Sequence, residues 1–200
     1  MAARIVDKEL KKQDILFAAL KVFGRQGVAN AKMIDIALEA GIGKGTIYEY
    51  FRSKDEIISA SFQAFLAKME TAKIDLKNTE MDSLQQLFYV IDGWTEILKR
   101  DPLEARVLID MWAESTRIGN GKGMNIMLEV IREYRNYLMK ILEQGVEKGE
   151  FRSMDISSMA TLIAATLDGL FLYWILGKGI VNLEDSIDTF KSTLTARMKK

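Results

Sequence analysis

The chain has 200 residues, and 48% of them are hydrophobic, which is enough to build a substantial core without stabilising disulfides or metals. Cysteine and histidine are both absent, which excludes disulfides, zinc thiolate sites and thiol nucleophiles and removes the commonest general base and metal ligand. The net charge is zero, and the first sixty residues hold ten Lys or Arg against eight Asp or Glu, so only modest non-specific affinity for nucleic acid is expected.

The same composition argues against catalysis. Carboxylate or lysine catalysis stays formally open, but the sequence has no paired-carboxylate motif, zinc signature, phosphate-binding loop or nucleophile elbow. We predict that the protein is not an enzyme and has no catalytic residues, cofactor or metal. The segment from Met1 to Lys12 is charged and lacks the apolar region of a cleavable signal, and we expect a cytoplasmic protein.

The predicted fold is all-α with about nine helices, because the chain has one proline and no segment that alternates apolar and polar residues. The first helix is expected from about Lys8 to Gln26, with Gly27 as its stop. A helix, a glycine turn and a second short helix are then expected between Asp35 and Phe51, the layout of a DNA-reading helix-turn-helix.

The spacing of apolar residues orients this helix-turn-helix. Ile36, Ala37 and Ala40 form one apolar stripe, and Gly41 ends the first helix. Ile47 and Phe51 face inward because they are four residues apart. The residues left near or on the outer side, where they could meet phosphates and base edges, are Lys44, Gly45, Thr46, Tyr48 and Tyr50.

The string I-A-L-E-A-G-I-G-K-G-T-I-Y-E-Y-F-R-S-K-D-E resembles the TetR family of transcriptional regulators, whose usual pattern is close to I-A-x-x-A-G-V-S-K-G-T-L-Y-x-Y-F followed by a lysine-bearing turn. The resemblance is close from Gln13 to Glu56. Other residues that fall where the family places their kind are Ile15, Ala18, Ala19, Phe23, Gly27 and Lys54.

The resemblance implies that the outer residues of the second short helix approach DNA and that Lys54 contacts a phosphate. Three positions depart from the family pattern: Ala31 and Lys32 replace a common pair of threonines, and Gly43 replaces a serine. Lys32 can restore a phosphate contact by its charge, so we include it in the predicted DNA-binding set. Glu49 either points away from DNA or accepts from a cytosine amino group.

The remaining helices can be placed from caps and breakers. Ser53 and Glu56 form a capping box for a fourth helix from residue 53, which links a DNA-binding domain, 1–55, to an effector-binding and dimerisation domain, 56–200. The other expected elements are a fifth helix after a polar stretch at 77–83, a sixth from Asp101-Pro102 to about Ile118, a flexible loop at Gly119–Gly123, a long seventh helix ended by Gly149, an eighth at about Ile156–Leu176 capped by Asp155, and a ninth capped by Asn182.

The fifth to eighth helices supply the candidates for an effector pocket. They are Phe88, Asp92, Trp94, Met111, Trp112, Met127, Tyr134, Asp168 and Phe171. A carboxylate beside aromatic rings favours a cationic ligand, and methionines and tryptophans make adaptable pockets, so the expected effector is small and either hydrophobic or cationic. Asp168 is the carboxylate that the pattern forces inward, either towards a ligand or into a hydrogen bond across a dimer interface.

The eighth helix is apolar nearly all round. Met159 to Leu176 is near the minimum length for a membrane span, but Asp168 at its centre favours a covered helix of a helical bundle, so no membrane partner is expected. With the ninth helix it looks like half of a four-helix dimer interface, which is where TetR-like regulators usually dimerise. The predicted interface residues are Leu170, Trp174, Leu183, Ile187, Phe190 and Leu194.

The sequence therefore predicts a homodimeric regulator that binds a double-stranded operator and is released by a small-molecule effector, most simply a repressor. The alternative is a ligand-independent helical module that binds DNA or another protein.

Overall fold

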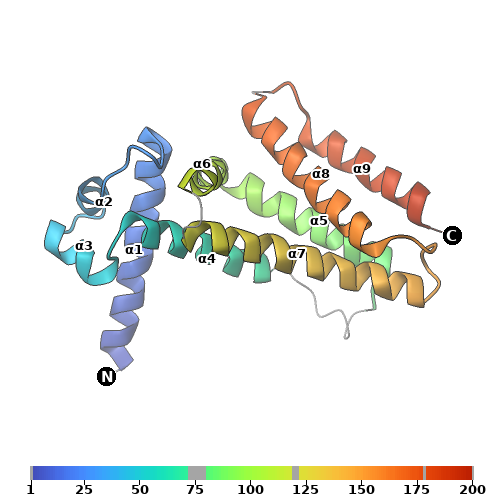
Figure 1. The fold of residues 1–200 in the computed structure, drawn as a ribbon, viewed down its shortest axis with the longest axis horizontal. Helices are drawn as coiled ribbons and strands as arrows, with labels where there is room; N and C mark the ends of the chain where they lie inside the picture. The colour runs from blue at the N-terminus through green and yellow to red at the C-terminus, as the bar shows by residue number, and fades with distance from the viewer. Residues whose placement is uncertain (1, 72–79, 119–121, 178, 200) are drawn as a thin grey trace. The chain divides into compact units, whose positions relative to one another are not determined.

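The computed structural model describes residues 2–71, 80–118, 122–177 and 179–199, and it confirms the all-α fold. The described residues form nine helices and contain no strand beyond one isolated bridge between Phe151 and Lys199. The helices are α1 (Ala2–Gln26), α2 (Met33–Glu39), α3 (Lys44–Tyr50), α4 (Lys54–Thr71), α5 (Ser83–Arg100), α6 (Pro102–Ile118), α7 (Lys122–Glu147), α8 (Ile156–Leu176) and α9 (Leu183–Met198), as drawn in Figure 1.

Several helix ends lie where local chemistry predicts them. Gly27 and Gly41 have φ of +79° and +65°, a conformation that favours glycine, and each follows the end of a helix. Asp155 caps α8 by accepting from the Ser158 N–H at 3.0 Å, and Asn182 caps α9 by accepting from the Glu184 N–H at 3.1 Å.

Other helix boundaries differ from the prediction. Helix α1 begins at Ala2, six residues before the expected start. Helix α7 begins at Lys122, so Lys122 and Gly123 are helical although the glycine-rich sequence predicted a loop there. The rest of that predicted loop, 119–121, lies outside the described residues.

The described chain forms two compact units. The first comprises Met1–Lys68 and Leu98–Leu128, and the second comprises Met69–Ile97 and Glu129–Lys200. The first unit therefore takes in α6 as well as α1 to α3 and most of α4, although α6 follows them by more than thirty residues. The functional division at residue 55 stays a prediction.

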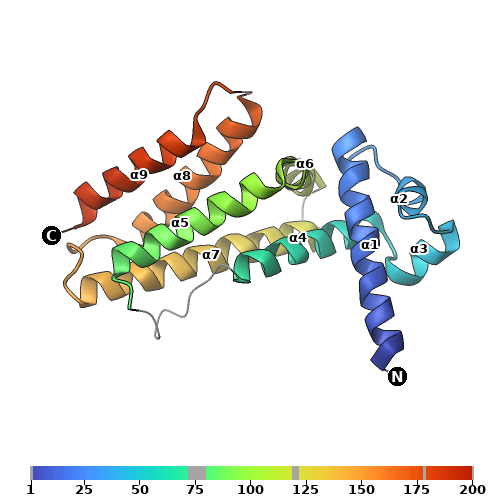
Figure 2. The same cartoon turned by 180° about the vertical axis from the view of Figure 1, so that it is seen from behind.

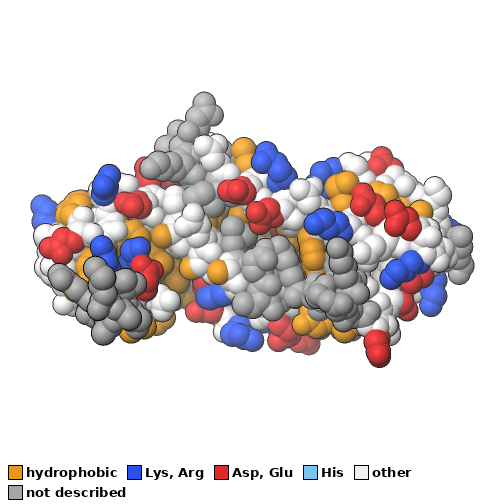
Figure 3. Space-filling view, turned by 90° about the horizontal axis from the view of Figure 1, so that it is seen from below, with side chains coloured by type: hydrophobic (Ala, Val, Ile, Leu, Met, Phe, Trp, Pro, Cys, Tyr) orange, Lys and Arg blue, Asp and Glu red, His pale blue; other side chains and the backbone are white. Residues whose placement is uncertain are grey.

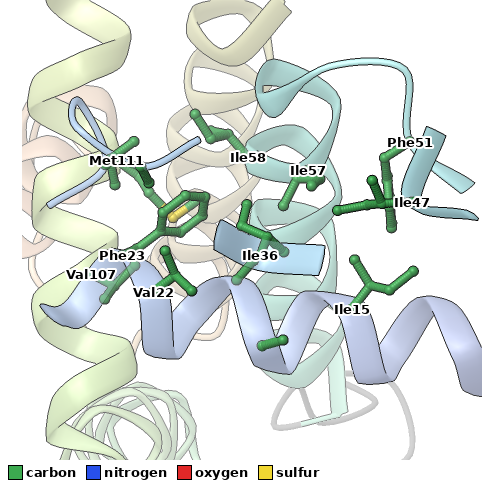
Figure 4. Packing of buried hydrophobic residues seen from close by; sticks show 14 of the residues in the cluster. Ile15, Val22, Phe23, Ile36, Ile47, Phe51, Ile57, Ile58, Val107 and Met111 are labelled. Carbon is green, nitrogen blue, oxygen red and sulfur yellow. The ribbon is translucent and has the colours of Figure 1, made fainter. Parts of the chain in front are cut away.

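The core of the first unit joins α1, the two short helices, α4 and α6. Figure 4 shows Phe23 of α1 facing Met111 of α6, and Ile15 at the other end of the cluster towards Ile47 of α3. Ile15, Ile36, Ile47, Ile57 and Met111 are fully buried. This shared core holds the helix-turn-helix on a rigid base.

The second unit contains most of α5, the later part of α7, and α8 and α9. Helices α8 and α9 run side by side in both views (Figures 1 and 2). The turn after α7 packs closely on that helix, because a Cβ added at Gly145 would lie 2.2 Å from the Phe151 ring. Glu150 also accepts a hydrogen bond from the backbone N–H of Ser83 at 2.7 Å and so ties this turn to the start of α5.

Helix α8 is long and apolar enough to cross a membrane, by length and composition alone. Only 22% of its most apolar window is buried within the chain. The sequence predicts a covered helix, whereas Leu162, Tyr173 and Leu176 of α8 are exposed within the chain.

Candidate nucleic-acid interface and ligand site

The turn between α2 and α3 is held by its backbone. The Gly41 N–H donates to the Leu38 carbonyl at 3.1 Å, and the Ile42 N–H donates to the Ala37 carbonyl at 3.0 Å. These two bonds close the end of α2 and set the direction of α3. The tight turn and the buried face of α3 at Ile47 agree with the predicted helix-turn-helix.

The outer face of α3 is open to solvent. Lys44, Gly45, Tyr48 and Glu49 are exposed, while Thr46 and Tyr50 are half-buried. Within the described residues, neither Lys44 nor Tyr48 makes a side-chain hydrogen bond or ion pair. A Cβ added at Gly45 would meet nothing within 4 Å, so the packing of the chain itself does not require a glycine there.

The start of α2 is organised by Asp35, which the sequence did not single out. Its carboxylate accepts from the Lys32 backbone N–H at 3.1 Å and from the Gln26 side-chain amide at 3.0 Å. The Asn30 side chain donates to the Gln26 carbonyl at 3.0 Å, within the turn that precedes α2. The Lys32 side chain is exposed and lies at the N-cap of α2.

Lys54 has a bracing role that the sequence did not reveal. Its Nζ donates to the carbonyls of Val28 and Ala29 at 2.7 and 3.0 Å and so ties the start of α4 to the turn after α1. Two of its three ammonium hydrogens are thereby engaged within the unit. A phosphate contact is left to the third hydrogen and to the exposed N-terminus of the helix.

The capping box at α4 is shifted by one residue from its predicted form. The Glu56 N–H donates to Ser53 Oγ at 3.2 Å as expected, but the Glu56 carboxylate accepts from the backbone N–H of Arg52 at 2.6 Å. The pair still satisfies two free donors at the helix start.

Helix α6 contacts the turn after α1 through Asp110. Its carboxylate oxygen Oδ2 accepts from the Val28 backbone N–H at 2.6 Å, and the same oxygen is the nearest atom, 3.5 Å away, to a Cβ built at Gly27. Val28 therefore contributes its N–H to Asp110 of α6 and its carbonyl to Lys54 of α4. These two contacts converge on one residue of the helix-turn-helix unit.

Two predicted effector residues, Met111 and Trp112, lie on α6 in the first unit. Met111 is fully buried in the core that includes Phe23 of α1, so it packs the base of the helix-turn-helix and is not a free pocket residue. Trp112, on the same helix, is 36% exposed. The sequence predicts Met111 as an effector contact because an apolar stripe does not show which other helices cover α6.

Asp92, a predicted polar residue of the effector site, is held in an ion pair on the surface. It is exposed on α5 and forms an ion pair with Lys191 of α9, whose Nζ lies 5.4 Å from the centre of the half-buried Phe88 ring. The three side chains therefore join α5 to α9. The side chain of Met127 lies outside the described residues.

The structure brings together the four remaining effector candidates, which come from α5, α7 and α8. Trp94 of α5 packs edge-on against Phe171 of α8, with ring centres 5.7 Å apart and planes at 80°. Phe171 lies one turn after Asp168 on α8. The negative charge of Asp168 also contributes to raising the pKa of the Tyr134 hydroxyl on α7.

Both polar groups of this cluster are perturbed by burial. Burial raises the pKa of Asp168 to about 6. The pKa of the Tyr134 hydroxyl is raised by burial and, to a smaller extent, by the negative charge of Asp168. The hydroxyl oxygen of Tyr134 is buried and has no hydrogen-bond partner among the described residues.

The predicted dimer residues fall into two groups. Leu183, Ile187 and Leu194 of α9 are 3 to 5% exposed, so they are already buried within one chain and are corrected as interface residues. Leu170, Trp174 and Phe190 are half-buried and keep some surface for a partner. The largest exposed side chains of α8 were not predicted: Leu162, Tyr173 and Leu176 are each more than 60% exposed.

Positive and negative side chains are mixed on one face of the molecule (Figure 3). On the face drawn in Figure 3, the coloured Lys and Arg side chains alternate with Asp and Glu, and neither sign forms a continuous patch. On this face, affinity for a polyanion would have to come from individual cations and not from a continuous basic patch.

Comparison with known proteins identifies relatives for both parts of the chain. Residues 15–60 match the family model described as bacterial regulatory proteins, tetR family, and residues 85–198 match the model of the C-terminal part of BetI-type transcriptional repressors. The fatty acid metabolism regulator protein of Bacillus subtilis is 26% identical over 171 residues, which cover 84% of this chain and 86% of that protein.

Solved structures share the fold. FadR of Bacillus subtilis in complex with stearoyl-CoA has a TM-score of 0.78 at 24% identity, covering 91% of this chain and 96% of that one. A structure described as a putative transcriptional regulator from Saccharomonospora viridis, in complex with choline, has a TM-score of 0.80 at 22% identity, covering 94% and 97%.

Proposed function

The chain belongs to the TetR family of bacterial transcriptional regulators, and we propose that it represses transcription by binding an operator until a small-molecule effector releases it. The protein is a sequence-specific DNA-binding regulator of the ligand-responsive kind. Its relatives are named as regulators or repressors, and two structures of the same fold hold ligands. The ligand-independent alternative has no comparable support.

The observation that carries the DNA-binding proposal is the open outer face of α3. Lys44 and Tyr48 are exposed side chains that have no partner among the described residues, and they stand on a short helix whose other face is locked into the core. A rigid helix with free polar groups suits a major groove. The proposed DNA-binding residues are Lys32, Lys44, Gly45, Thr46, Tyr48, Tyr50 and Lys54.

We assign effector binding to the second unit and signal transfer to the helices that touch the turn after α1. An effector can act only by binding the DNA-free state more tightly, and a coupling of about 1 to 3 kcal/mol is ordinary. Movement of α4 would change the separation of two recognition helices. Asp110 and Lys54 both bond to Val28, so shifts of α6 or α4 would reach the helix-turn-helix through this residue.

The homodimer is proposed to form through α8 and α9. Leu162, Tyr173 and Leu176 lie 11 and 3 residues apart, so they share one face of α8. Gly169 lies on the same face, and a Cβ there would meet nothing within 4 Å, which leaves room for close approach of a second helix. Two copies would place two recognition helices in half-sites about one helical turn apart, or a multiple of it.

A regulator of this kind works in the cytoplasm and needs no catalytic group, cofactor or metal. We propose this location and these absences for the protein on the strength of its family. The division into a DNA-binding part, 1–55, and an effector-binding and dimerisation part, 56–200, is proposed on the same basis.

The experiment is operator selection from random duplexes followed by a mobility-shift titration. The double variant Lys44→Ala/Tyr48→Ala should lose binding to the selected operator while its circular-dichroism spectrum and mass in solution stay unchanged. A matched control is Lys140→Ala/Tyr89→Ala, which removes an exposed lysine and an exposed tyrosine from the second unit. Unaltered binding by the α3 variant would refute the proposed DNA surface.

A further inference from the structure

Asp168 is an unusual residue for its surroundings. It stands in the middle of α8, the most apolar helix of the described chain, and it is half-buried. Among the described residues its carboxylate has no hydrogen bond and no ion pair. A carboxylate in such a place is costly unless something outside the chain pairs with it.

Two cations on other helices of the second unit, Arg135 and Lys191, have partners other than Asp168. Arg135, which follows Tyr134 on α7, donates to Thr161 Oγ1 at 2.9 Å and also to Ser157 Oγ. Lys191 of α9 pairs with Asp92. The protein also has no histidine that could take up a proton beside the carboxylate. Within the described residues, neither Arg135 nor Lys191 forms an ion pair with Asp168.

The groups near Asp168 match one type of ligand. The buried Tyr134 hydroxyl has no hydrogen-bond partner among the described residues, and the charge of Asp168 contributes to raising its pKa. Phe171, one turn along α8, is packed edge-on by Trp94 and lies 6.2 Å from the Trp174 ring, centre to centre. A carboxylate beside several aromatic rings binds organic cations, because the faces of the rings are negative as well.

We infer that Asp168, the Tyr134 hydroxyl and the ring pair of Trp94 and Phe171 form the recognition end of the effector site, and that the effector is a small organic ammonium cation. Asp168 supplies the counter-charge, the rings contact the alkyl groups around the nitrogen, and the Tyr134 oxygen faces the cation or bonds to a polar group beside it. This inference rests on the proposed function, because it names the ligand class of the same unit.

The test compares two probes that differ by one charge. (3-Hydroxypropyl)trimethylammonium chloride carries the cation, and 4,4-dimethylpentan-1-ol has a carbon in place of the nitrogen. Isothermal titration of the free protein should give at least about tenfold tighter binding of the cation, the effect of roughly 1.4 kcal/mol of charge recognition. Equal binding of the two probes, or binding of the neutral one alone, would overturn the inference, as would no binding of either.

Three variants locate the site. Asp168→Asn keeps the size of the side chain and should remove the preference for the cation, and Tyr134→Phe should weaken cation binding about three- to tenfold. Asp188→Asn, an exposed change on α9, should bind as the wild type does. Unchanged selectivity in folded Asp168→Asn protein would contradict the assignment, and if that variant fails to fold, unchanged cation binding by Tyr134→Phe would do so.

The experiments can refute the ligand class and the proposed operator binding independently of each other. The titration uses no DNA, so loss of cation selectivity leaves operator binding untouched. Conversely, wild-type protein that binds the cation but selects no operator would refute the proposed function and leave the ligand class standing.

Discussion

The carboxylate of Asp110 on α6 accepts a hydrogen bond from the backbone N–H of Val28 at 2.6 Å, across 82 positions of sequence. This partly buried contact fixes α6 to the turn between α1 and α2. Asp110→Ala would leave the Val28 N–H without its acceptor, and we expect the free energy of unfolding to fall by about 1 to 3 kcal/mol.

Chemical denaturation measures this loss. Asp110→Asn should lose less, because an amide oxygen can still accept the bond. Glu143→Ala, which removes an exposed carboxylate on α7, should change stability by less than about 0.5 kcal/mol. Equal stability of Asp110→Ala and wild type would show that the contact contributes nothing.

Lys54 should behave as a structural residue as well as a DNA contact. Its Nζ bonds to two backbone carbonyls, so Lys54→Ala removes both bonds and should lower the unfolding free energy by about 1 to 3 kcal/mol, even without DNA. Thermal unfolding of the free protein measures this. Lys44→Ala is the matched control, since Lys44 is exposed and has no partner in the described part of the chain, and it should leave the melting temperature almost unchanged. If Lys54 serves only a phosphate, the two variants will melt alike.

A substitution at Gly45 should affect DNA binding without lowering the stability of the fold. Gly45→Ala should keep the stability of the wild type or gain up to about 1 kcal/mol, because the added methyl meets no neighbour and alanine favours a helix. The same methyl would stand on the surface proposed to approach DNA, so operator affinity should fall about tenfold or more. Mobility shift and thermal melting test the two effects on one protein. A variant that binds as tightly as the wild type would remove Gly45 from the DNA surface.

The features that could be predicted from the sequence are local. Gly27, Gly41, Asp155 and Asn182 end or cap helices through residues at most four positions away, so neighbouring letters suffice to find them. The partial burial of Asp168 agrees with its position in an apolar helix.

Contacts between distant segments could not be predicted. Nothing near Asp110 or Lys54 in the sequence indicates that both bond to Val28. An apolar stripe shows that a helix face is covered, but not by which element. For this reason Met111 was assigned to a ligand although it packs beside α1, and Leu194 to a partner although its own chain buries it.

The exposed side chains of α8, Leu162, Tyr173 and Leu176, should contribute to dimer formation but not to the folding of one chain. Leu162→Glu places a charge on a side chain that is 61% exposed, so the chain should fold but sediment as a monomer. Leu194→Glu places the charge at a position that is 5% exposed and should unfold or precipitate the protein. Leu10→Glu, at an exposed position of α1, controls for added charge. Sedimentation velocity decides, and a stable dimer of Leu162→Glu would place the interface elsewhere.

The stability of the protein should depend on pH through Asp168. Its pKa is raised to about 6 in the folded chain from an ordinary 3.8, so the folded state holds this proton more tightly than the unfolded state does. Well below pH 4, the Asp168 carboxyl is therefore protonated and neutral in both the folded and the unfolded state, and it has no effect on stability. Ionisation penalises the folded state progressively between about pH 4 and pH 6, and the penalty is constant above that range. A shift of about two units corresponds to roughly 3 kcal/mol at most, and solvent access at this half-buried position reduces it.

Asp168→Asn removes this penalty without changing the size of the side chain. Denaturation curves at half-unit steps from pH 4 to pH 8 should show the variant matching the wild type at the acid end and exceeding it by about 1 to 3 kcal/mol at the neutral end. Asp188→Asn, exposed on α9, controls for the removal of an aspartate. A saturating cation that pairs with Asp168 should narrow the difference at neutral pH, because it stabilises only the protein that keeps the carboxylate. A gap between Asp168→Asn and wild type that is the same at every pH would mean that the carboxylate is not desolvated on folding.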